Sequence, residues 1–266
     1  MTAVPVYGHP ALMVKTGGTR TLVVSDLHLG IEGEFAARGV SLPSQAPRVK
    51  ARLVELIGKK KPDRLIMLGD VKHNIPVASW QEWRELPRLF EDLLKLLPVD
   101  IVAGNHDGDI RGMLPEGVTV HEPSGIVIGK KKMVGLMHGH AWPSPELMKA
   151  ELIVMGHNHP AVEFRDELGG RIVEPVWVRM KLKKERLPKK LKIAVGKRPP
   201  ELLLVPAFGE LVGGAPVNRK MPTELIGPIF KAGAAVLDAG EIYLLDGTFL
   251  GTVKASRKFL STTSRA

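Results

Sequence analysis

The chain has 266 residues, of which 44% are hydrophobic and 25% charged, and its formal net charge is +10. This composition predicts a globular protein with a sizeable core and excludes a disordered one. The absence of cysteine excludes disulfides, zinc–thiolate sites and iron–sulfur clusters, so any metal needs nitrogen and oxygen ligands. No apolar run approaches the ~18 residues of a membrane span, and the first ten residues do not resemble a secretory signal. We therefore expect a cytoplasmic protein that does not contact a membrane.

The first half of the chain alternates between strand and helix patterns. Short apolar runs predict three strands, over 21–26, 64–68 and 99–103. Apolar residues at helical spacing predict three helices, near 30–38, from about Ser44, and over 79–97. The last is one long helix or two helices that meet at Pro87. Strands separated by helices indicate a parallel sheet flanked by helices.

The second half is richer in strand patterns. Four short strands are predicted, over 118–122, 125–129, 132–137 and 152–155, with one short helix near 144–150. Between 161 and 255 strand patterns dominate, punctuated by glycine, proline and asparagine turns. This arrangement predicts an α/β sandwich in which a second sheet packs on the first. With no internal repeat and no flexible linker, we expect residues 1–266 to form a single domain whose C-terminal strands complete the second sheet.

Five of the apolar runs end in polar blocks. These blocks are SDLHLG (25–30), LGD (68–70), GNHD (104–107), HGH (138–140) and GHNH (156–159). The carboxyl ends of strands in an open α/β sheet line the crevice where ligands bind, so the blocks should meet. They supply seven candidate metal ligands: Asp26, His28, Asp70, Asn105, His138, His157 and His159.

The spacing of these residues favours two metal ions. Asp26 and His28 are two residues apart, so on extended backbone both side chains point the same way, and the same spacing relates His157 to His159. Seven ligands are too many for one ion, whereas two ions ~3.5–4 Å apart can clamp a phosphoryl group and activate a water molecule. Asp70 stands alone after its strand and is the natural bridge. The donor types suit Mn²⁺, Fe²⁺ or Zn²⁺.

His106 lies between a candidate ligand and a carboxylate. Asn105 can bind a metal through its side-chain oxygen, and His106 can then reach over the metals toward a substrate. We expect Asp107 to hold the imidazole of His106 in one tautomer. His106 would then stabilise transition-state charge or protonate a departing alkoxide.

The ordered series DLH, GD, GNHD, HGH and GHNH, over residues 26–159, resembles the calcineurin-like metallophosphoesterase superfamily. The resemblance implies an α/β sandwich of two sheets with a di-metal site at one edge, and His106 as the catalytic histidine supported by Asp107. It also implies two ligand sets, one formed by Asp26, His28, Asp70 and His159 and the other by Asp70, Asn105, His138 and His157.

A narrower resemblance covers nearly the whole chain. The segments DLHLGIE, GDVKH (69–73), PAFGELVGGAPVN (206–218) and LLDGTFLG (244–251) are similar to phosphoesterases related to double-strand-break repair nucleases. Some bacterial members of that group accompany DNA ligases and act as endonucleases. The resemblance implies nucleic acid or a nucleotide-like diester as substrate, and DNA-repair proteins as partners.

The positive charge is concentrated in one segment. Between Arg179 and Arg198 there are ten basic residues and one acidic residue, so this segment carries +9. Apolar and basic residues alternate on both sides of Leu187-Pro188, which predicts a hairpin over about 176–196. Its basic face is either a nucleic-acid contact or a solvated edge that blocks aggregation. The candidate contacts on this face are Trp177, Arg179, Lys181, Lys183, Lys190 and Lys192.

Three residues near the polar blocks, Lys72, His73 and His140, are candidates for substrate contact, although a solvated loop and a structural histidine explain them equally well. Together these features predict a phosphoesterase with two divalent ions, preferably Mn²⁺, that hydrolyses phosphodiesters as a DNA or RNA nuclease. The alternatives are a phosphatase or phosphodiesterase for small nucleotides, and a non-catalytic scaffold with the same fold.

Overall fold

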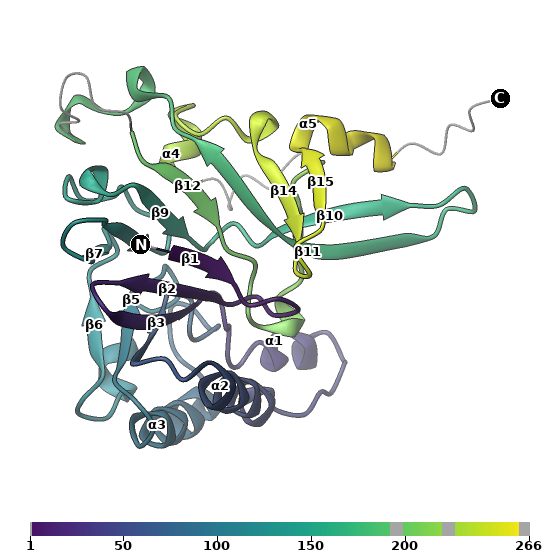
Figure 1. Ribbon diagram of the computed structural model, residues 1–266. Helices are drawn as coiled ribbons and strands as arrows, with labels where there is room; N and C mark the ends of the chain where they lie inside the picture. Colours follow the sequence, from purple (N-terminus) through teal and green to yellow (C-terminus); the bar gives the residue numbers. More distant parts are fainter. Residues whose placement is uncertain (1, 192–198, 220–226, 261–266) are drawn as a thin grey trace.

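The computed structural model describes residues 2–191, 199–219 and 227–260 and places two β-sheets face to face (Figure 1). The first sheet has six strands in the order β1-β2-β3-β4-β5-β6. They are β1 (Thr2–Pro5), β2 (Leu12–Thr16), β3 (Thr19–Val24), β4 (Arg64–Met67), β5 (Val99–Val102) and β6 (Thr119–His121). Strands β3 to β6 run parallel, as the strand–helix alternation predicts, while β1 and β2 join antiparallel.

Three helices belong to this first half: α1 (Glu32–Ala37), α2 (Ala46–Lys60) and α3 (Trp80–Leu94). Leu53 of α2 and Phe90 of α3 share one buried core with Leu22, Met67 and Ile101 of the sheet, so both helices cover its outer face. The predicted pattern over 79–97 is one continuous helix that contains Pro87. Among the described residues, no helix is long and apolar enough to cross a membrane.

The second sheet has the strand order β13-β10-β11-β12-β9-β8-β7, and β14 pairs with β11 and β15 beside this path. Its strands are β7 (Ile126–Ile128), β8 (Val134–Met137), β9 (Leu152–Met155), β10 (Pro160–Arg165), β11 (Arg171–Lys181), β12 (Glu201–Leu204), β13 (Ala215–Pro216), β14 (Glu241–Leu244) and β15 (Phe249–Thr252). Val154, Trp177 and Leu203 pack against Val23 and Ile66 of the first sheet. The predicted two-sheet sandwich is therefore confirmed.

The other face of the second sheet is covered by short elements. Helices α4 (Pro228–Lys231) and α5 (Val253–Ser256) contribute Ile229 and Val253 to a third buried core. The helix expected near 144–150 is only a 3₁₀ turn, Leu147–Lys149. The assignment of the whole chain to one domain stays a prediction.

The hairpin expected over 176–196 is wrong for the described residues. Val176–Lys181 is the end of the long strand β11, and two 3₁₀ turns, Lys184–Arg186 and Lys189–Leu191, follow it. The reason is that both edges of β11 are already paired, one with β12 and the other with β14, so no edge is open to a second basic strand. Residues 192–196 lie outside the described part of the chain.

Candidate functional site

The structure brings the seven candidate ligands together at the carboxyl ends of five strands. Asp26 and His28 follow β3, Asp70 follows β4, Asn105 follows β5, His138 follows β8, and His157 and His159 follow β9. Two strand sets from different sheets meet here: β3, β4 and β5 are parallel in one sheet, and β8 and β9 are parallel in the other. The crevice between two sets of strand ends is therefore the candidate site.

The backbone of these blocks is unusual. Six described residues other than glycine have a positive φ, and five of them are candidate ligands: Asp26 (55°), His28 (47°), Asp70 (48°), His157 (68°) and His159 (41°). Residues with a side chain rarely adopt this region, and such strain is typical of functional sites. A Cβ atom on Gly104 would lie 2.2 Å from Asp70 Oδ1, so only glycine fits beside this carboxylate.

The first group of ligand atoms comes from Asp26, His28, Asp70 and His159, which all lie within 4.8 Å of one another. His159 Nε2 is 3.2 Å from Asp26 Oδ1, and His28 Nε2 is 3.6 Å from Asp70 Oδ2. Both Nε2 atoms are buried and make no hydrogen bond to any described residue. Buried ring nitrogens that converge on two carboxylates without hydrogen bonds fit a metal ion as their missing partner.

The second group consists of Asp70, His138 and His157. His138 Nε2 lies 3.3 Å from Asp70 Oδ2, 3.1 Å from His157 Nδ1 and 3.2 Å from Asn105 Oδ1. His138 Nδ1 is 2.7 Å from the carbonyl of Leu68, to which it donates, so Nε2 is the atom that faces the other donors. Asp70 belongs to both groups, so its carboxylate would be available to an ion in either one.

Burial and neighbouring carboxylates give three of the candidate histidine ligands different protonation states. Burial lowers the pKa of His28 to about 3 and that of His157 to about 4, so both rings are neutral and offer a lone pair. Burial opposes the charged form of His138, but the carboxylate of Asp70 raises its pKa to about 9. In the metal-free protein His138 and Asp70 therefore form an ion pair, and a metal ion would replace the proton between them.

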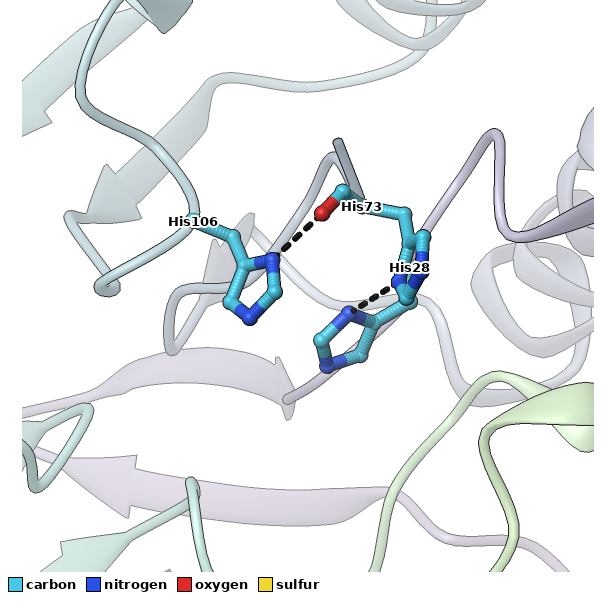
Figure 2. A group of neighbouring side chains, drawn as sticks. All are labelled: His28, His73 and His106. Atoms are coloured by element: carbon cyan, nitrogen blue, oxygen red, sulfur yellow. Dashed lines mark hydrogen bonds between the residues drawn. The ribbon is translucent and has the colours of Figure 1, made fainter. Parts of the chain in front are cut away.

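His73 links two of the other histidines (Figure 2). Its Nδ1 lies 3.2 Å from Nδ1 of His28, and its Nε2 lies 3.0 Å from Glu34 Oε2. Its backbone carbonyl accepts a hydrogen bond from Nδ1 of His106, whose own N–H donates to Asp70 Oδ1 at 2.9 Å. A chain of contacts thus runs from Glu34 through His73 to His28, which fixes the orientation of a candidate ligand. Nothing in the sequence singled out Glu34.

The predicted support of His106 by Asp107 is wrong. Asp107 is only 4% exposed, and its two oxygens accept hydrogen bonds from main-chain N–H groups of Val71 (2.9 Å), Lys72 (3.4 Å) and Gly104 (2.8 Å). These bonds tie the loop after β4 to the loop after β5. The carbonyl of His73, and not the carboxylate of Asp107, holds the imidazole of His106.

The predicted substrate contact of Lys72 is also wrong. Its side chain is 0% exposed, and Nζ lies 3.0 Å from Asp109 Oδ1 and donates to the carbonyl of Asn74. The ammonium group therefore stabilises the loop from inside. For His140, which is half-buried with its ring 5.3 Å from that of His138, substrate contact stays a prediction.

Glu82 supports the same loop and was missed by sequence reasoning. It is buried at the start of α3, and its Oε1 accepts hydrogen bonds of 2.9 Å from the main-chain N–H groups of both His73 and Asn74. Its Oε2 accepts from the N–H of Ser79, and Ser79 Oγ accepts from the N–H of Glu82. The capping-box sequence S-x-x-E marks the helix start but carries no signal for the contact with the site.

The basic candidates lie away from this site. Trp177 is 1% exposed, which contradicts the predicted stacking on a base, and Arg179 is paired with Glu201. Lys181 pairs in register with Glu201, the first residue of β12, and Glu201 pairs with Leu152, the first residue of β9. The candidate ligands His157 and His159 instead follow the last residue of β9. Lys181 and the exposed Lys183 are therefore at the opposite end of the sheet. Lys190 lies in a 3₁₀ turn beyond them, and Lys192 is outside the described residues.

The chain is similar to known proteins in sequence and in fold. A model of the calcineurin-like phosphoesterase family matches residues 19–204. Among solved structures, the chain is similar to the nuclease MPE of Pseudomonas putida, with a TM-score of 0.51 and 21% identity over 89% of this chain and 97% of that one. It is also similar to YfcE, a phosphoesterase from E. coli, with a TM-score of 0.36 and 20% identity over 55% of this chain and 72% of that one. The family model spans more than half of the sequence and all five polar blocks, and the chain therefore belongs to the calcineurin-like phosphoesterase family.

Proposed function

We propose that this phosphoesterase is a metal-dependent phosphodiesterase that cleaves nucleic acid. The observation that carries the proposal is a groove of about 280 Å³ that is lined by the candidate ligand His159 and by Ala161, Val173 and Pro175 of β10 and β11. A diester inside a polymer continues on both sides of the scissile phosphate, so its site must be open, whereas a terminal phosphate needs only an enclosed pocket. A protein of the same fold is named as a nuclease, which supports this choice.

The two groups of ligand atoms fit a pair of divalent ions that share Asp70, with Asn105 completing the second group. When bound, such ions supply Lewis acidity to a phosphoryl group and to a water molecule. We propose Mn²⁺, with Fe²⁺ or Zn²⁺ as alternatives, because imidazole nitrogens and carboxylate oxygens together suit these metals.

We propose that His106 is the residue that moves a proton. It is half-buried beside the buried ligands, and its ring contacts that of His28 edge-on, with 4.8 Å between centroids. Because a carbonyl can only accept, the bond to His73 keeps a proton on Nδ1 and leaves Nε2 to give or take the second proton. We propose that Nε2 of His106 protonates the oxygen of the departing nucleotide.

The proposal is tested by hydrolysis of bis-p-nitrophenyl phosphate and p-nitrophenyl phosphate with Mn²⁺, with and without a chelator. We expect turnover of the diester that the chelator abolishes, followed by cleavage of DNA or RNA oligonucleotides. A strong preference for the monoester and no cleavage of oligonucleotides would favour a phosphatase for small nucleotides. Absence of turnover despite bound metal would favour a scaffold.

A further inference from the structure

A buried carboxylate on β10 gathers three arginines. Glu163 is 0% exposed, and its oxygens lie 2.7 Å from Nε of Arg165, 2.7 Å from Nε of Arg171 and 3.3 Å from Nη1 of Arg219. The three arginine side chains are 38%, 54% and 44% exposed. One carboxylate neutralises only one guanidinium, so among the described residues this arginine cluster (Arg165, Arg171, Arg219) presents two uncompensated positive charges to solvent.

The arginine cluster lies on the same strand face as three residues of the groove that His159 lines. In the antiparallel pair β10–β11, Ala161 faces Pro175, Glu163 faces Val173, and Arg165 faces Arg171. Side chains two residues apart share one face of a strand. Ala161, Val173 and Pro175 line the groove. The arginines therefore lie on the same strand face as these groove residues, further along β10 and β11 from His159.

The distance from the candidate metal centre to the cluster suits a nucleic-acid strand. Glu163 is four residues after His159, which is roughly 13 Å along an extended strand. Phosphates of one helical strand are about 3.4 Å apart along its axis, so this interval corresponds to about four phosphates. The basic residue Lys181 lies in the other direction along β11, ten residues or roughly 33 Å from Arg171 and beyond the stretch that pairs with Ala161.

We propose that the arginine cluster is a subsite for the sugar–phosphate backbone of a nucleic-acid strand whose scissile phosphate lies at the His/Asp centre. This proposal rests on the nuclease function proposed above. Guanidinium groups bind phosphate oxygens through paired N–H donors, and the buried Glu163 holds three of them in place. The main chain also fixes Glu163, because its N–H donates to Asn218 Oδ1 and its carbonyl accepts from Asn218 Nδ2. Two acidic residues in the hairpin turn, Asp166 and Glu167, end the basic surface.

The test compares two double variants with the same loss of charge. R171Q/R219Q removes two arginines of the cluster but keeps Arg165 as the partner of the buried Glu163, so that the fold survives. R84Q/R88Q removes two exposed arginines of α3 as the matched control. For each protein, kcat and KM are measured with Mn²⁺ on a 12-nucleotide single strand, a dinucleotide and bis-p-nitrophenyl phosphate, between 50 and 200 mM NaCl.

We expect R171Q/R219Q to raise KM for the 12-mer on the order of tenfold, since two charge-assisted phosphate contacts are lost. The dependence of log(kcat/KM) on log[NaCl] should become shallower by about 1.4 for two contacts to a single strand. The dinucleotide and bis-p-nitrophenyl phosphate do not reach the cluster, so their kcat/KM should stay unchanged. The control should behave as the wild type on all three substrates.

Several results would overturn the inference. If the wild type cleaves the 12-mer and R171Q/R219Q matches the control, the subsite is wrong while the nuclease function stands. If R171Q/R219Q loses activity equally on all three substrates, the arginines act on the centre through the fold. If the wild type hydrolyses bis-p-nitrophenyl phosphate but neither the 12-mer nor the dinucleotide, the nuclease function and the subsite fail together. If K181Q/K183Q, and not R171Q/R219Q, raises KM for the 12-mer, the nucleic acid binds at the other end of the sheet.

Discussion

Replacing Asp107 by alanine should unfold the loops around the site rather than disturb proton transfer. The carboxylate accepts short hydrogen bonds from the N–H groups of Val71 and Gly104 and a longer one from that of Lys72. Leaving a buried N–H group without a partner costs ~1–3 kcal/mol, so losing the two short bonds should cost about 4 kcal/mol. For a chain of this size that corresponds to a fall in Tm of roughly 8–16 °C.

The measurement is thermal unfolding of the metal-free wild type, Asp107→Ala and Asp107→Asn. Asparagine keeps one acceptor oxygen but turns an amino group toward one N–H donor, so it should lose about half as much stability as alanine. At a temperature where all three are folded, each variant should keep the wild-type ratio of activity on a dinucleotide to activity on bis-p-nitrophenyl phosphate. The reasoning would be refuted if Asp107→Asn kept its Tm but lost dinucleotide activity selectively, because the carboxylate would then act on His106.

Three further outcomes are expected. His106→Ala should retain its metal content and lose far more activity on natural diesters than on bis-p-nitrophenyl phosphate, whose leaving group needs no proton; equal losses would argue against leaving-group protonation. Asp70→Asn should lose metal and activity together, as measured by metal analysis, and a fully metallated active variant would exclude bridging. Asp70 raises the pKa of His138 to about 9 despite burial. Protonation of His138 therefore stabilises the metal-free fold fully below pH ~6.5, and this stabilisation is lost as the pH rises through 9. Metal displaces the proton, so the gain in Tm on adding Mn²⁺ should grow between pH 6.5 and 9; a gain independent of pH would contradict that exchange.

The core elements of the first half follow from local pattern. Strands β3, β4 and β5 lie within two residues of their predicted positions, because each is a short apolar run with a polar end. The convergence of the polar blocks within each sheet was predictable for the same reason, since parallel strands deliver their carboxyl ends to one edge. The meeting of the two sets depends on how the two sheets pack. Pairing in the second half was harder to predict, because a strand that is buried on both faces, such as β11 at Val176–Val178, gives no information about its neighbours.

The sequence misjudged residues whose role depends on long-range contacts. Asp107 is adjacent to His106 in the chain, but its carboxylate turns toward main-chain donors after β4 and leaves the imidazole to the carbonyl of His73. No side-chain pattern can reveal a main-chain carbonyl as an orienting group. Glu34 likewise contacts His73 across 39 residues of sequence, and nothing near it in the chain indicates that contact.

By itself, the sequence determined the types of candidate ligand and the order along the chain of the strands that carry them, because both depend on residue identity and local periodicity. Only the tertiary structure decided which charges share a strand face with the groove at His159. The lysine-rich segment has the largest local charge, yet β11 places Lys181 at the far end of the sheet. The arginines around Glu163 are scattered over 55 residues, and the pairing of β10 with β11 and β13 brings them to one place. Charge density along a chain is a local property, whereas charge density on a surface depends on which strands pair.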